Sequence, residues 1–205
     1  MRENNKKYYE PLEQMMAVRH QYMAKIIKKT FKTSIYEFFH KCKILDIGCG
    51  TGEFINNYYE LGSICTGIDI NNNFKLKNKK NFNLVNSDIF EFLKNNKKRY
   101  DIIFMYEFLE HLGTKEKKIL LKKLPSILNS NGIIFISTLS KNLISRFFSI
   151  NIAENLLNLL PKNTHDHNLY LSPSDLQTLL NKNGLSIHNI EVISYNPLIK
   201  SFKLS

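Results

Sequence analysis

The order of short apolar runs and helical patterns between residues 43 and 139 limits the possible folds of this chain more than any other feature. The apolar runs are "KILDIGC" (43–49), "SICTGIDI" (63–70), "FNLVNSD" (82–88), "YDIIFMY" (100–106) and "GIIFISTL" (132–139). The segments between them, 52–62, 89–96 and 114–132, carry helical spacing, and Gly132 is expected to stop the last helix. Strands that alternate with helices form a parallel sheet. We therefore expect an α/β fold with a doubly wound, mostly parallel sheet of seven strands, these five and two closing strands described next.

The remaining strands and helices are expected after this core. An apolar helical segment covers 142–160, "SPSD" (172–175) opens another helix, and two closing strands are expected around 187–193 and 199–204. With 205 residues and 43% hydrophobic content, the chain can bury one substantial core. We expect a single domain over 1–205, with an N-terminal helical segment (1–40) and a lid-like helical insertion (141–171).

Charge and cysteine content restrict the class of protein. The formal net charge of +11 favours an anionic partner, but most basic residues are lysines scattered among asparagines, which is typical of solvated loops. The three cysteines, Cys42, Cys49 and Cys65, form no CxxC pair, so we expect a reduced cytoplasmic location. The N-terminus has no signal-peptide core, and nowhere do about 18 apolar residues run together. We expect a soluble or peripheral protein.

The first strand is followed by a glycine-rich turn. "LDIGCGTG" places Gly48, Gly50 and Gly52 between a strand and a helix, where backbone can approach a ligand closely and helix N–H groups can meet an anion. A dinucleotide fingerprint, G-x-G-x-x-G, would need glycine where this chain has Glu53. A carboxylate there would repel a pyrophosphate, so we expect a different cofactor; the alternative is a tight turn without a ligand.

Acidic residues surround this turn at the ends of the predicted strands. Asp46 precedes it, Asp69 ends the second strand, and Asp88 follows the third. With G-x-G-x-G, this pattern resembles the S-adenosylmethionine (SAM) site of class I methyltransferases. The resemblance implies that Asp69 accepts both ribose hydroxyls and that Asp88 lies near the adenine.

Three ionisable groups follow the fourth apolar run. Glu107, Glu110 and His111 have i, i+3 and i+4 spacing, so we expect them on one face of a helix. If the run is a buried parallel strand, they stand at its carboxyl end, where open α/β sheets bind ligands. The alternative is a solvated first helical turn.

Four motifs resemble one methyltransferase family in order and spacing. They are "EFLEHL" (107–112), "STLSKN" (137–142), "AENLLNLLPKNTHD" (153–166) and "YNPLIKSFKL" (195–204). The ubiquinone-biosynthesis O-methyltransferases show E-M-L-E-H, S-T-L-N-R-N, L-P-K-G-T-H-D and Y-N-P…F-x-L. "PLEQMMAVRHQYM" (11–23) also looks like this family's segment ahead of the first strand.

The resemblance implies a SAM-dependent O-methyltransferase that acts on a catechol-type hydroxyl of a polyprenylated ring, at the dihydroxybenzoate stage and again at 3-demethylubiquinol. By position, Arg19 matches a residue that helps to hold the cofactor, and Asp46, Gly48, Gly50, Asp69, Asp88 and Tyr106 fall in the cofactor site. Glu107, Glu110 and His111 match a divalent-metal motif, for which we expect Mg²⁺. His165 would be a fourth ligand or the catalytic base, or it stabilises its loop by a hydrogen bond.

Two other functions stay open on the sequence. Small-RNA 2′-O-methyltransferases also use a Glu-x-x-Glu-His metal motif, but no interleaving of aromatic and arginine residues suggests a stacking platform, so we do not expect a nucleic-acid partner. The second is a SAM-binding subunit without catalysis, which the retained Glu107, Glu110 and His111 argue against.

The substrate also suggests where the chain works. The apolar segment 142–162 can cover a hydrophobic tail or lie at a lipid interface, or it is an ordinary core helix. We expect peripheral association with the anionic inner face of the cytoplasmic membrane, strengthened by the basic surface. Other enzymes of ubiquinone biosynthesis are further possible partners.

Overall fold

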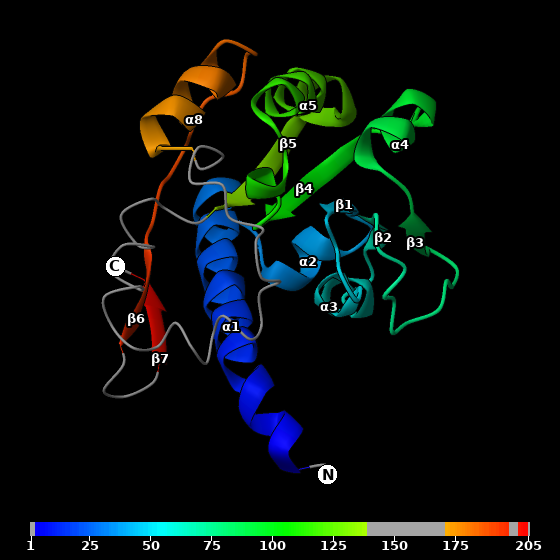
Figure 1. Ribbon diagram of the computed structural model, residues 1–205, viewed down its shortest axis with the longest axis vertical. Coiled ribbons are helices and arrows are strands. Elements are labelled where there is room, and N and C mark those ends of the chain that lie inside the picture. Colours follow the sequence, from blue (N-terminus) through cyan, green and yellow to red (C-terminus); the bar gives the residue numbers. More distant parts are fainter. Residues whose placement is uncertain (1–2, 139–170, 197–200, 205) are drawn as a thin grey trace. The chain divides into compact units, whose positions relative to one another are not determined.

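The computed structural model describes residues 3–138, 171–196 and 201–204 (Figure 1). The chain divides into two compact units, one of Cys42–Ile187 and one of Met1–Lys41 with His188–Ser205. Each unit is described by itself. The expected lid-like insertion lies outside the described residues apart from Leu171, and the single domain over 1–205 stays a prediction.

A five-stranded parallel sheet forms the centre of the larger unit. Its order is β3-β2-β1-β4-β5, with every neighbouring pair parallel. The strands are β1 (Lys43–Ile47), β2 (Ile64–Asp69), β3 (Phe82–Asn86), β4 (Tyr100–Tyr106) and β5 (Leu128–Ser137). All five predicted runs are therefore strands, and the α/β class with a doubly wound parallel sheet is confirmed.

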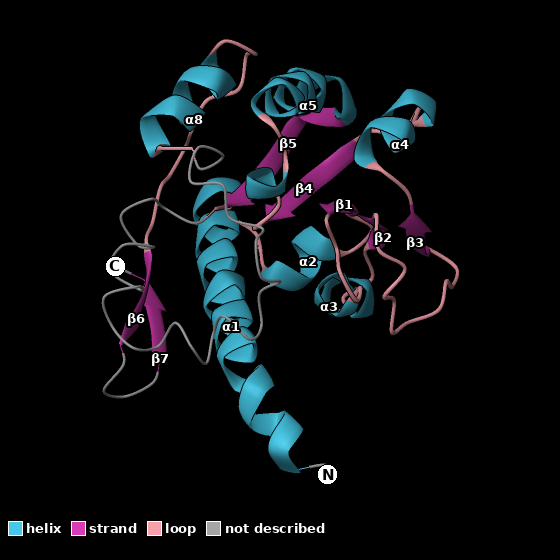
Figure 2. Cartoon of the chain, in the orientation of Figure 1, coloured by secondary structure: helices cyan, strands magenta, loops and turns pink. Residues whose placement is uncertain are grey.

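Helices cover both faces of this sheet (Figure 2). They are α3 (Glu53–Glu60), α4 (Ile89–Asn95), the short 3-10 helix η1 (Leu109–His111), α5 (Thr114–Ile127) and α8 (Pro173–Asn181). Alternate residues of β4 pack against the helices on opposite faces of the sheet. Ile103 and Met105 belong to the core with α5 and α8. Phe104 packs on Phe54 and Tyr58 of α3. Both faces of β4 are buried, which explains its uninterrupted apolar sequence.

The end of α5 differs from the prediction. The helix ends at Ile127, and Leu128 has extended backbone (φ −94°, ψ 137°) and pairs with Tyr100. Arg99 donates to the Leu128 carbonyl at 2.9 Å, and the Asn129 amide donates to the Asp101 carboxylate at 2.6 Å. The prediction that Gly132 stops this helix is therefore wrong. Residues 128–131 belong to β5, whose first residue pairs with β4.

The smaller unit contains the long helix α1 (Glu3–Phe31), the short helix α2 (Ile35–Phe39) and the antiparallel strands β6 (Ile193–Asn196) and β7 (Ser201–Leu204). A capping box starts α2: the Ser34 hydroxyl accepts the Glu37 N–H, and the Glu37 carboxylate accepts the Ser34 N–H. Asn189 donates to the Tyr22 hydroxyl at 3.1 Å, which ties the segment before β6 to α1.

The two closing strands differ from the expectation in place and pairing. The first was expected around 187–193, but β6 begins at Ile193, and residues 187–192 are outside helices and strands. In the described residues, β6 and β7 pair with each other in a separate two-stranded sheet, so a single seven-stranded sheet is not confirmed. Within the same residues, none of the helices has the length and apolar character that a membrane span requires.

Stability should depend on the inner face of α5. Leu120 is fully buried in the core, whereas its neighbour Ile119 is 52% exposed. We expect Leu120→Ala to lower the free energy of unfolding by about 2–5 kcal/mol, because it leaves a cavity. Ile119→Ala, the matched control, should change it by less than about 1 kcal/mol. Urea denaturation measures both, and equal midpoints for the two variants would contradict this packing.

Candidate cofactor and substrate site

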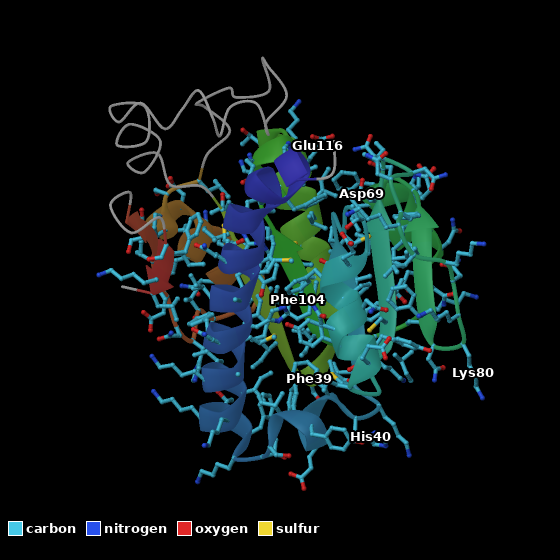
Figure 3. All side chains as sticks on the ribbon, turned by 90° about the horizontal axis from the view of Figure 1, so that it is seen from below. Phe39, His40, Asp69, Lys80, Phe104 and Glu116 are labelled. Carbon is cyan, nitrogen blue, oxygen red and sulfur yellow. The ribbon has the colours of Figure 1, made fainter. Side chains whose placement is uncertain are left out.

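The candidate site lies at the carboxyl edge of the parallel sheet. The glycine turn follows β1, Asp69 is the last residue of β2, and residues 107–112 follow β4. Figure 3 labels Asp69 at the end of its strand and Phe104 in the middle of the sheet. Because β2, β1 and β4 are neighbours and run parallel, these three segments meet at one edge.

The glycine turn is held against β2 by backbone hydrogen bonds. The Gly48 and Cys49 N–H groups both donate to the Ile68 carbonyl, at 2.8 and 3.0 Å. Gly48 has φ +77°, and a Cβ there would lie 2.6 Å from the Phe108 ring. Glycine is therefore required at this position for its backbone conformation and for the close approach of Phe108.

Asp69 is joined to the same turn through its side chain. One carboxylate oxygen accepts the Gly50 N–H at 2.8 Å, and the other accepts the Asn71 N–H at 2.8 Å. A Cβ on Gly50 would meet no atom within 4 Å, so the space beside this glycine is open. The predicted neighbourhood of the glycine turn and Asp69 is present, with an acceptor side chain beside open space.

Asp46 and Cys49 belong to the packed layer under the turn. Asp46 is buried within β1. Burial, with smaller contributions from Asp46 and Asp69, raises the pKa of the Cys49 thiol above its usual range. A Cβ on Gly67 would lie 2.7 Å from the Cys49 sulfur, so this thiol fills space against β2. A buried, protonated thiol is inert, which agrees with a packing role for Cys49.

Asp88 and Tyr106 have local structural partners. The Asp88 carboxylate caps α4, accepting the Phe90 N–H at 2.8 Å and the Glu91 N–H at 3.3 Å. Tyr106 ends β4 and lies against Phe54 with ring centroids 5.1 Å apart. These contacts fix both residues at the carboxyl edge, and their roles toward a cofactor stay predictions.

Glu107 is not on a helix, contrary to the expectation of a shared helical face. It directly follows β4 with φ +46°, and η1 begins only at Leu109. Its N–H donates to the Ser137 carbonyl at 3.1 Å, and its carboxylate accepts the Ser137 hydroxyl at 2.7 Å. The end of β5 therefore holds Glu107 in a left-handed conformation, which is costly for a non-glycine residue.

Glu110 and His111 lie in η1 in different surroundings. Glu110 is buried and accepts the Thr138 hydroxyl at 3.4 Å, whereas His111 is exposed. Across the ranges 3–138, 171–196 and 201–204, no three His, Cys, Asp or Glu side chains are grouped so that they could hold a metal ion. In this arrangement Glu107, Glu110 and His111 do not fit a metal centre.

The structure does not place Arg19 or His165 at the carboxyl edge of the sheet. Arg19 is buried on α1 and donates to the Met15 sulfur at 3.5 Å, within the smaller unit. His165 lies outside the described residues. Their cofactor and catalytic roles stay predictions.

Two features of the site were not predicted from the sequence. Ile70, immediately after Asp69 at the carboxyl edge of the sheet, is a large apolar residue that is 69% exposed. Lys75 joins the loop after β2 to the glycine turn: its N–H donates to the Thr51 carbonyl at 3.1 Å and its ammonium to Glu53 at 2.9 Å. This hydrogen bond lowers the pKa of Glu53 below its usual range. The position of Ile70 directly after a strand-ending acid was the available signal.

Comparisons with known proteins agree with this geometry. A methyltransferase-domain family model matches residues 15–190. The ubiquinone biosynthesis O-methyltransferase of Pelagibacter ubique is 34% identical over 204 residues, covering 96% of this chain and 84% of that protein. The enzyme of the same name from Coxiella burnetii is 34% identical over 169 residues, covering 79% and 71%.

Solved structures show the same fold at lower identity. The plantazolicin methyltransferase BpumL, in complex with S-adenosylhomocysteine (SAH), has a TM-score of 0.62 at 21% identity, covering 94% of this chain and 73% of that one. A SAM-dependent methyltransferase from Archaeoglobus fulgidus has a TM-score of 0.57 at 24% identity, covering 94% and 81%. With the family model and the relatives above, this places the chain among the SAM-dependent methyltransferases, in the family of the ubiquinone biosynthesis O-methyltransferases.

Proposed function

We propose that this enzyme transfers the methyl group of SAM to a catechol-type hydroxyl of a polyprenylated ring, with dihydroxybenzoate and 3-demethylubiquinol intermediates as substrates. The observation that carries the proposal is the 34% identity to the Pelagibacter ubique relative along nearly the whole chain. The glycine turn, Asp69 and the segment 107–112 meet at one edge of the sheet and support it. The turn and Asp69 would hold SAM, and residues 107–112 would face the acceptor ring.

The reaction is an in-line displacement at the methyl carbon. The bond from the catechol oxygen to carbon forms as the carbon–sulfur bond breaks, the electron pair stays on sulfur, and SAH leaves. The hydroxyl proton must pass to a base, because a neutral catechol oxygen is a weak nucleophile. We propose His165 as that base, and Glu107, Glu110 and His111 as the groups that orient the two oxygens.

Methyl transfer from radiolabelled SAM to a soluble demethylubiquinol analogue tests this function. We expect label in the quinol product and none in a small RNA offered under the same conditions. The negative control is an analogue in which one of the two hydroxyls is a methoxy group and the other is absent, so that no hydroxyl is left to accept a methyl group. Label in RNA alone would replace this proposal with the RNA methyltransferase, and SAM binding without transfer to either would indicate a non-catalytic subunit.

The cofactor role of Asp69 predicts a specific loss of affinity. We expect Asp69→Ala to weaken SAM binding by on the order of 2 kcal/mol, about thirtyfold in Kd, since charge-assisted hydrogen bonds to the ribose would be lost. Glu60→Ala removes an exposed carboxylate at the end of α3 and is the matched control. Calorimetry measures both variants, and an unchanged Kd for Asp69→Ala would remove the assignment.

A divalent ion, with Mg²⁺ as the first candidate, is a separate part of the proposal. It rests on the resemblance of "EFLEHL" to the family's metal motif and on the hard oxygen donors of Glu107 and Glu110. A bound ion would lower the pKa of the reacting hydroxyl. Since the three side chains do not form a metal group in the described residues, no catalytic step is assigned to it.

Removal of divalent ions by a chelator tests whether the enzyme needs a metal. We expect EDTA to stop methyl transfer reversibly, with Mg²⁺ restoring it, and Glu107→Ala or His111→Ala to abolish turnover while the Kd for SAM stays within about threefold, a shift below 1 kcal/mol. Full turnover of the unmodified enzyme in EDTA would exclude the metal. The acceptor-orienting role of the same residues would then be judged by the two variants alone.

A further inference from the structure

Lys117 is the buried lysine of α5. The chain is rich in lysine, yet among the lysines whose side chains the structure describes, only Lys117 is buried, with 2% of its surface exposed. It shares the inner face of the helix with Leu120, Leu121 and Leu124, all fully buried. An ammonium group in such surroundings needs specific partners, because burial removes its hydration.

The partners of Lys117 belong to the segment that leaves β4. Its ammonium donates to the Leu112 carbonyl at 2.7 Å. The Leu112 N–H donates in turn to the Leu109 carbonyl at 3.2 Å, so Leu112 closes η1. Lys117 thereby fixes the end of the turn that carries Glu110 and His111.

Glu110 is a second buried charge in this turn, with 6% of its surface exposed. Burial lowers the pKa of Lys117, and the negative charge of Glu110 acts in the opposite direction. Glu116, which is exposed at the start of α5, acts in the same direction but more weakly. Glu110 also accepts the hydroxyl of Thr138, the residue directly after β5. Removing one of two opposed buried charges leaves the other uncompensated, so the charges of Glu110 and Lys117 are coupled.

The turn that Lys117 holds is part of the candidate site. Phe108, directly before η1, lies so close to Gly48 that a Cβ there would be 2.6 Å from its ring. The His111 N–H donates to the Phe108 carbonyl at 3.1 Å, which links the backbone of Phe108 to η1. The segment whose end Lys117 holds therefore begins beside the glycine turn, at Phe108.

We propose that Lys117 is a positioning residue for methyl transfer: it holds Glu110 and the turn 109–112 in the orientation that the acceptor ring requires. This rests on the proposed function of residues 107–112. Lys117 touches neither SAM nor the acceptor, so it acts on the rate of transfer and leaves cofactor affinity unchanged.

A double-mutant cycle on the full chain tests this role. Lys117→Met removes the charge with little change of length, Glu110→Gln removes the carboxylate, and Lys118→Met, at an exposed site on the same helix, is the matched control. We expect Lys117→Met to lower kcat at least tenfold while the Kd for SAM stays within threefold, and Lys117→Arg to recover kcat to within threefold. In the Glu110→Gln background, Lys117→Met should lower kcat by less than twofold further. Lys118→Met should match the unmodified enzyme.

Circular dichroism before each assay establishes the folded fraction, to which kcat is normalised. Should Lys117→Met alone fail to fold, the Lys117→Arg variant and the double variant decide, because each avoids a lone buried charge. Wild-type kcat in Lys117→Met, no recovery in Lys117→Arg, or losses that multiply in the double variant would each overturn the positioning role. Wild-type kcat in Glu110→Gln would remove both the proposed role of Glu110 and this inference.

Amide hydrogen exchange separates this inference from the proposed function. If the unmodified enzyme does not methylate the quinol analogue, the proposed function fails, but the structural part of the inference is still tested. Exchange at residues 109–112 should rise in Lys117→Met and stay unchanged in Lys118→Met. Equal exchange in both variants would overturn the role of Lys117 without reference to any substrate.

Discussion

The Ile68 carbonyl oxygen accepts two backbone N–H groups of the glycine turn, and the arrangement of the site depends on this pairing. It requires the turn to approach β2 so closely that Gly67 has no room for a side chain. Asp69, which follows Ile68, thereby lies where its carboxylate accepts the Gly50 N–H. The register of β1 against β2 thus fixes the turn and the acid together, before any cofactor is bound.

The parts of the site that the sequence predicts are those that follow from strand periodicity. All five parallel strands were identified as apolar runs. Because parallel strands end at one edge, the glycine turn, Asp69 and the segment after Tyr106 were expected to meet. The helix after "SPSD" was likewise predicted, since Ser172 caps it and Pro173 occupies its first turn. Local rules sufficed wherever the controlling contact lies within a few residues.

Prediction fails where a distant contact overrides the local pattern. The i, i+3 and i+4 spacing suggested one helical face for Glu107, Glu110 and His111, but Ser137, thirty residues from Glu107 along the chain, binds its backbone and its side chain. Helical spacing continued past Ile127, but pairing with β4 turns Leu128 into a strand residue. Neither partner can be identified from a single sequence, because each is set by the neighbouring strand in space.

The burial of Lys117 could be predicted from local spacing, but its hydrogen-bond partner could not. Its spacing of three, four and seven residues to Leu120, Leu121 and Leu124 marks the buried face of a helix, a signal that the abundance of lysine in this chain conceals. Burying two opposite charges is a poor means of gaining stability, since apolar residues of similar size are often as stable or more so. Packing of α5 alone therefore does not require Lys117 and Glu110. An ammonium donor does give what an apolar side chain cannot, a directed hydrogen bond to the Leu112 carbonyl, which ends the turn that follows Phe108.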